Sequence, residues 1–83
     1  GIDDVTSRLR SALAQGVPAF NAGRPDLCRD AYREALIALQ DHAALTPGER
    51  KIVATALTNA EGAPPTEGAW ALRFAIDTVL ASI

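Results

Sequence analysis

The stretch Gly16-Val17-Pro18-Ala19-Phe20-Asn21-Ala22-Gly23-Arg24-Pro25-Asp26-Leu27-Cys28 decides the fold of this chain. Asn21 and Gly23 are of the types that end helices in a left-handed conformation, and Pro25 suits the first position of a new helix. Asp26 complements the positive end of that second helix. The stretch therefore predicts two helices folded back on each other through one tight turn.

Apolar residues recur at steps of three and four on both sides of this turn, which is the spacing of one helix face. Before the turn they predict a helix over about residues 3–22, and after it a second helix over about residues 25–43. Pro18 lies inside the first helix and is expected to kink its last turn or to start that turn separately. The second helix carries the stripe Leu27, Cys28, Ala31, Tyr32, Ala35, Leu36 and Leu39.

Two further helices are predicted in the second half of the chain. Thr46-Pro47-Gly48-Glu49 has the pattern of a capping box and starts a helix over residues 47–61. A loop around Pro64 follows, and Thr66 is expected to cap a last helix over residues 66–82. No segment alternates as a strand does. The predicted class is all-α, a single domain over residues 1–83 built as a small closed bundle of four antiparallel helices.

The composition excludes several classes of function. The chain has 83 residues, 48% of them hydrophobic, and a net charge of −2, which is typical of one globular domain. Basic and acidic residues are interleaved, so we expect no nucleic-acid partner. No apolar run approaches the roughly 20 residues of a membrane span, so no membrane insertion is expected. One cysteine and one histidine do not supply a structural zinc site, and no cofactor is expected.

The chain contains no methionine. We therefore expect it to be trimmed at its start or cut from a larger, processed or exported protein. Abundant alanine, and arginine used in preference to lysine, are typical of bacterial proteins. The sequence itself assigns no compartment.

The spacing of Gly16, Gly23, Cys28, Tyr32 and Ala35 resembles the signature of a tetratricopeptide repeat over about residues 16–39. The resemblance implies that Gly16 permits close helix contact, that Gly23 makes the turn, and that Cys28 and Tyr32 pack against the first helix. The signature occurs once, whereas solenoids of this kind need about three units to bury a continuous core. The second pair of helices is therefore expected to cover the first.

No catalytic set can be assembled from the sequence. Cys28 is the one notable nucleophile, and His42 lies some 20 Å away if both belong to one helix, at about 1.5 Å per residue. Cys28 is expected to be buried and inert. His42 is expected to cap the end of the second helix. We therefore expect a protein that is not an enzyme.

Two groups of residues are candidates for binding. Trp70 and Phe74 lie one turn apart, on a different face from the Leu72 stripe of the last helix. Core packing is the favoured expectation for two large aromatic residues in a chain with few of them, and an exposed partner surface is the alternative. Arg73 is expected to form a surface ion pair with Asp77, four residues on.

The second group surrounds the first turn: Asn21, Arg24, Cys28 and Tyr32. Asn21 is expected mainly as a turn residue, and its alternative role is an anion site shared with Arg24 at the start of the second helix. The predicted function is a non-catalytic helical module that binds a protein partner or a second copy of itself. The alternative is a small-molecule or anion site near the first turn, around Pro18, Phe20, Asn21, Arg24, Cys28 and Tyr32.

Overall fold

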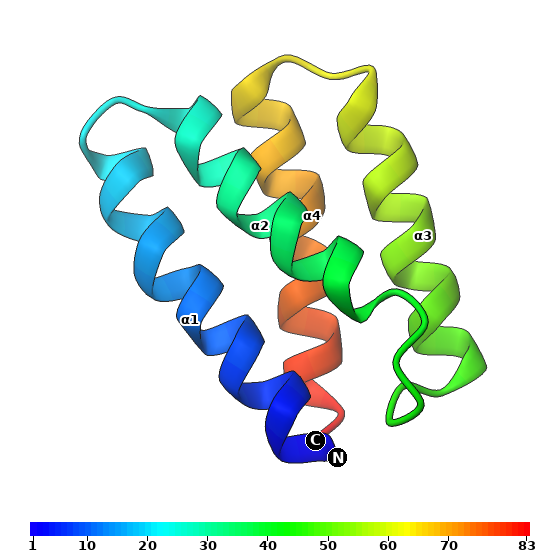
Figure 1. Cartoon of the computed structure of the whole chain (residues 1–83). Helices are drawn as coiled ribbons and strands as arrows, with labels where there is room; N and C mark the ends of the chain where they lie inside the picture. Colours follow the sequence, from blue (N-terminus) through cyan, green and yellow to red (C-terminus); the bar gives the residue numbers. More distant parts are fainter.

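The computed structural model describes all 83 residues as four helices without strands (Figure 1). They are α1 (Ile2–Asn21), α2 (Pro25–Leu39), α3 (Pro47–Glu61) and α4 (Pro65–Ala81). The predicted all-α class and small four-helix bundle are confirmed. None of the helices combines the length and the hydropathy that crossing a bilayer demands.

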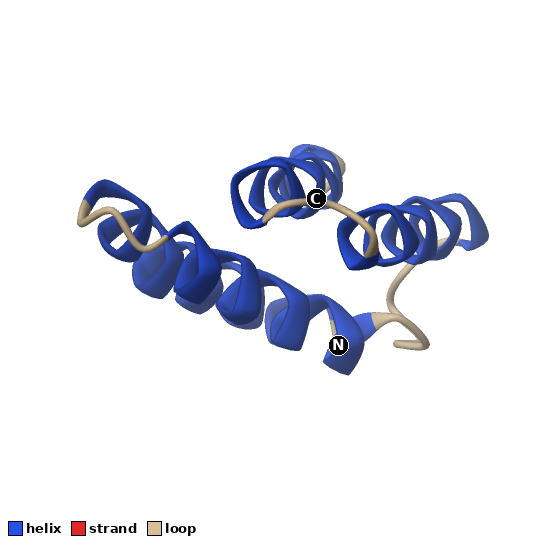
Figure 2. Cartoon of the chain, turned by 90° about the horizontal axis from the view of Figure 1, so that it is seen from above, coloured by secondary structure: helices blue, strands red, loops and turns tan.

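The helices alternate in direction along the chain. Figure 1 shows α1 and α3 running one way and α2 and α4 the other, with both termini at the same end of the bundle. The most extensive contacts join α1 to α2, α2 to α4, and α3 to α4, whereas α1 touches α4 little. Viewed along the helices, the two hairpins form two layers (Figure 2). The parallel pair α2 and α4 therefore forms the centre, with α1 and α3 on the outside.

The first hairpin crosses closely at Gly16. A methyl group added to Gly16 would overlap the ring of Tyr32, so only glycine lets the two helices approach this far. Gly23 makes the turn with a φ of 81°, a left-handed conformation that favours glycine. Cys28 and Tyr32 are both buried. The packing that the repeat-like spacing implies for these four residues is confirmed.

Pro18 neither ends α1 nor starts a separate turn, because α1 is one continuous helix to Asn21. Both Pro18 and Ala14, whose carbonyl group loses its hydrogen bond to the proline, lie on the exposed side of α1. Water can therefore bind that carbonyl group, which explains why the helix tolerates the proline.

The core is apolar throughout. It comprises 17 buried side chains from all four helices and Leu45 of the loop, and no charged side chain is buried among them. Alanine supplies six of these positions: Ala12, Ala35, Ala56, Ala60, Ala69 and Ala75. Small side chains at helix crossings let the backbones approach closely.

The prediction that the second helix extends to residue 43 is wrong, because α2 ends at Leu39. The chain must turn there to bring Leu45 into the core. His42 lies in this connection rather than at a helix end, and its Nδ1 accepts a hydrogen bond from the Ala44 N–H at 3.0 Å. The Arg50 guanidinium donates to the His42 carbonyl oxygen at 3.2 and 3.3 Å, which joins the loop to α3.

The capping box of α3 is confirmed. The Glu49 N–H donates to Thr46 Oγ1 at 3.1 Å, and the Thr46 N–H donates to Glu49 Oε1 at 2.8 Å. The prediction that Thr66 caps the last helix is wrong, because α4 begins one residue earlier, at Pro65. A residue before proline is held extended, so Pro64 becomes the last residue outside the helix and Thr66 falls in its first turn.

Candidate functional site

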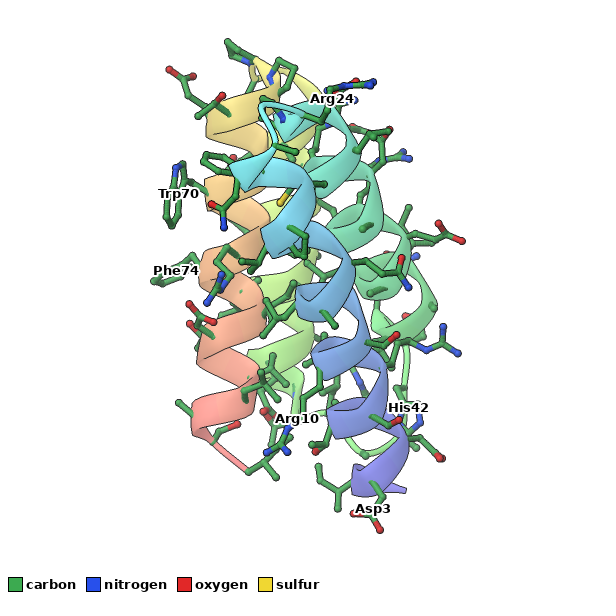
Figure 3. The ribbon with its side chains drawn as sticks, turned by 90° about the vertical axis from the view of Figure 1, so that its left-hand side faces the viewer. Asp3, Arg10, Arg24, His42, Trp70 and Phe74 are labelled. Atoms are coloured by element: carbon green, nitrogen blue, oxygen red, sulfur yellow. The ribbon has the colours of Figure 1, made fainter.

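Trp70 and Phe74 project from α4 into solvent, side by side (Figure 3), with 61% and 67% of their surface exposed. The expectation that they fill the core is therefore wrong. The inner face of α4 carries Ala69, Leu72 and Ile76, all buried, so Trp70 and Phe74 lie on the opposite side of the helix. We call the exposed pair Trp70 and Phe74 the aromatic ridge.

One cleft lies on each side of the aromatic ridge. The cleft between α3 and α4 has a volume of about 340 Å³ and includes Phe74 in its wall, together with Lys51, Ile52, Thr55, Ala56, Asn59 and Ala71. Lys51 and Glu67, which lies one turn before Trp70, take part in no ion pair within the chain. The ridge thus has an unpaired anion near the start of α4 and an unpaired cation on the neighbouring α3.

The second cleft lies between the first hairpin and α4. Its volume is about 230 Å³, and it is lined by Val17, Phe20, Asn21, Cys28, Tyr32, Ala69, Trp70 and Arg73. Six of these were predicted as binding residues from two separate parts of the sequence: Phe20, Asn21, Cys28, Tyr32, Trp70 and Arg73. The rings of Phe20 and Trp70 meet edge to face, with their centroids 5.8 Å apart.

Tyr32 forms the inner wall of this cleft. Only 2% of its surface is exposed, and its hydroxyl interacts with the Cys28 thiol and the Arg73 guanidinium. Burial raises the pKa of Tyr32, the neighbouring Cys28 thiol raises it further, and Arg73 opposes the change. The phenol therefore stays protonated at neutral pH and can donate a hydrogen bond.

Arg73 stands at the mouth of the cleft. Its Nε donates to Asp77 Oδ1 at 2.9 Å, as predicted for this pair, and this hydrogen bond is the main cause of the raised pKa of Arg73. The Arg73 guanidinium also interacts with the Tyr32 hydroxyl. Arg73 can thus hold Asp77 and still donate toward the cleft, since a guanidinium has five N–H groups.

Three predicted residues do not line this cleft. Arg24 lies at the top of the molecule (Figure 3) and binds Asp26 with two hydrogen bonds, at 3.0 and 3.2 Å. Pro18 lies on the exposed side of α1. Phe74 lies one turn along α4 and lines the other cleft.

Val17 and Ala69 line the cleft but were not among the predicted site residues. Val17 precedes Phe20 and Asn21 by one turn on α1, and Ala69 precedes Arg73 by one turn on α4. Residues four apart lie on the same face of a helix, so the predicted site residues Asn21 and Arg73 could have indicated Val17 and Ala69 as well.

The cleft brings no histidine or carboxylate next to Cys28. No group of three His, Cys, Asp or Glu side chains anywhere in the chain could hold a metal ion. The residues of the cleft offer apolar walls and hydrogen-bond donors, which are the elements of a binding site.

Comparison of the chain with protein-family models, curated proteins and solved structures yields no match. The function is therefore argued from the geometry described above.

Proposed function

We propose that this chain is a helical interaction module that binds a second copy of itself through the aromatic ridge. The observation that carries the proposal is the exposure of Trp70 and Phe74, 61% and 67%, on adjacent turns of one helix. Isolated exposed apolar residues are ordinary on protein surfaces, but a tryptophan and a phenylalanine side by side are typical of interaction hot spots.

The ridge is complementary to itself. If two copies of α4 pack antiparallel about a twofold axis, Trp70 of each copy meets Phe74 of the other, which is the isologous arrangement most homodimers use. The same rotation carries Glu67 of one copy toward the cleft that holds Phe74 and Lys51 of the other. The same register sets Glu67 of one copy level with Asp77 of the other, whose charge Arg73 already balances, so Lys51 is the free charge that complements Glu67.

Phe74 contributes part of the apolar area that a reversible dimer would bury. A fully exposed phenylalanine offers about 200 Å², so the exposed 67% of Phe74 amounts to about 130 Å². Its burial in both copies contributes up to about 6 kcal/mol at about 25 cal/mol per Å², before the cost of association.

Sedimentation velocity over a range of protein concentrations tests the proposal. The wild-type chain is expected to shift from monomer to dimer, and Phe74→Ser should remain monomeric. The matched control is Ile37→Ser, because Ile37 is 41% exposed but lies on α2, away from the ridge. A chain that stays monomeric at millimolar concentration, or a control that dissociates the dimer equally, would refute the proposal.

Charge exchange tests the register of the dimer. Lys51→Glu and Glu67→Lys should each weaken association, because each places like charges opposite one another. The double exchange should restore it. If the double variant associates as weakly as the single variants do, the antiparallel register is excluded.

A second function, the binding of a small molecule, is favoured by one specific observation. A cleft lies beside Asn21 and Cys28, and the Tyr32 and Arg73 side chains give it a polar end. Trp70 belongs both to this cleft and to the aromatic ridge, whereas Phe74 belongs only to the ridge, so Phe74→Ser separates the binding of a ligand from that of a second copy.

A further inference from the structure

The cleft between the first hairpin and α4 has two chemically distinct parts. Its walls are apolar, with Val17, Phe20 and Ala69 on opposing helices and the Trp70 indole at the rim. Its polar groups are the Asn21 amide, the Tyr32 hydroxyl and the Arg73 guanidinium. A ligand that fits must therefore carry an apolar body and a polar end.

The Tyr32 hydroxyl and the Arg73 guanidinium form one polar end of the cleft. The two groups interact, and Arg73 opposes the rise that burial and the Cys28 thiol cause in the pKa of Tyr32. No side-chain nitrogen or oxygen of the chain is both fully buried and unpaired, so this end of the cleft is satisfied without a ligand. An acceptor atom placed in the cleft could receive hydrogen bonds from both groups.

The polar groups consist mainly of donors. The Tyr32 phenol and the Asn21 amide each offer donor hydrogens, and Arg73 adds the N–H groups that Asp77 does not use. The Asp77 side chain is about half exposed, so solvent screens its charge. The polar end of the ligand is therefore an acceptor, and a carboxylate suits a guanidinium and a phenol together.

The volume sets the size of the ligand. At the packing density of protein interiors, about 0.74, a space of about 230 Å³ holds about 170 Å³ of atoms. That is the size of one aromatic ring with a short acid side chain. The Phe20 and Trp70 rings, 5.8 Å apart, provide faces and edges for such a ring.

We propose that this cleft binds a small aromatic carboxylic acid, with the ring between α1 and α4 and the carboxylate on Tyr32 and Arg73. The inference rests on the second of the two proposed functions, small-molecule binding, and names its ligand class. It requires no dimer.

The test is a titration of the full chain with 3-phenylpropionate, followed by the fluorescence of Trp70, the only tryptophan. The neutral amide of the same acid is the matched probe. We expect the acid to bind at least tenfold more tightly than the amide. A peptide that ends in phenylalanine offers the same ring and carboxylate, so an acetylated dipeptide with a free C-terminal phenylalanine distinguishes a peptide end from a free acid.

Three variants assign the contacts. Tyr32→Phe keeps the buried ring and removes only the hydroxyl, so it should fold normally and weaken binding of the acid about tenfold. Arg73→Gln should remove the preference for the acid over the amide. Phe74→Ser, which alters the aromatic ridge outside this cleft, should leave the affinity unchanged.

The outcomes separate the ligand class from the site itself. Equal binding of acid and amide, with a loss in Tyr32→Phe, would overturn the carboxylate and leave the small-molecule function in place. No change in Trp70 fluorescence or in the amide NMR spectrum with any probe would overturn both.

Discussion

Replacement of Gly16 by alanine tests whether the first hairpin depends on a side-chain-free crossing. The new Cβ would overlap Cε1 of Tyr32 and lie 2.8 Å from Cζ and 3.0 Å from Cδ1. Carbon atoms prefer separations of about 3.5 to 4.0 Å, so the Tyr32 ring must move. Tyr32 lines the cleft between α1 and α4, so we expect the ring to move toward that space.

Two opposing effects set the size of the change. Alanine in place of glycine within a helix stabilises it by about 1 kcal/mol. Overpacking of a filled site costs typically about 1 to 3 kcal/mol, and here a buried aromatic ring is displaced. We expect a net loss of about 1 to 2 kcal/mol in the free energy of unfolding of Gly16→Ala.

Gly68→Ala is the matched control. Gly68 is also helical and buried, but a Cβ there would lie 3.4 Å from its nearest atoms, the Ala60 carbonyl oxygen and Arg29 Cδ, which is ordinary contact. This variant should be neutral or more stable by up to about 1 kcal/mol. Urea denaturation, followed by the helical circular dichroism signal, measures both.

A double-mutant cycle isolates the contact with Tyr32. In a Tyr32→Ala background the obstruction is gone, so Gly16→Ala should become stabilising by about 1 kcal/mol. If Gly16→Ala stabilises the wild-type chain as much as Gly68→Ala does, the close crossing of α1 and α2 is refuted.

The remaining predictions concern stability. Trp70→Ala should lower the free energy of unfolding by no more than about 1.5 kcal/mol, because it removes chiefly an exposed ring and its contact with Phe20. By contrast, Leu72→Ala, at a fully buried position of the same helix, should cost about 2 to 5 kcal/mol by thermal or urea denaturation. Thr46→Ala removes the α3 cap and should cost about 1 kcal/mol, with Thr46→Ser as the variant that retains the cap. The pKa of Glu49 is lowered from 4.5, first by the Ser82 hydroxyl and then by the Thr46 N–H. Ionised Glu49 therefore stabilises the folded chain above pH 4.5, and this contribution is lost as the pH falls through the lowered pKa of the folded state. In Glu49→Gln the free energy of unfolding should depend less on pH in this acidic range.

Much of the secondary structure could be predicted because its signals are local. Glycine and proline fix the backbone around Gly23 and Pro25 without help from distant residues, and the Thr46 capping box closes within four residues. Of the two wrong boundaries, the start of α4 follows from the local constraint that Pro65 puts on Pro64, whereas the end of α2 depends on tertiary packing. α2 stops at Leu39 because Leu45 must enter the core, a demand that the helical pattern of residues 40–43 does not reveal.

The candidate site could be predicted only in part. Asn21, Cys28 and Tyr32 belong to one hairpin, so their proximity followed from the predicted turn. Trp70 and Arg73 share a helix, but nothing in their spacing says that α4 lies beside the end of α1. The exposure of Trp70 was misjudged because residue type favours the core, whereas the buried residues of α4 lie on the opposite side of the helix.

The sequence by itself determined the four helices, the tight turn at Gly23 and the contact of Gly16 with Tyr32, because these depend on backbone preferences and on neighbours within one hairpin. Only the tertiary structure decided that α2 and α4 form the centre, that the aromatic ridge faces solvent, and that a cleft opens between α1 and α4. The physical reason is that helix periodicity specifies which face is apolar but not which neighbour covers it. Which helix covers a given apolar face depends on how the side-chain volumes fit at all of the helix–helix contacts together.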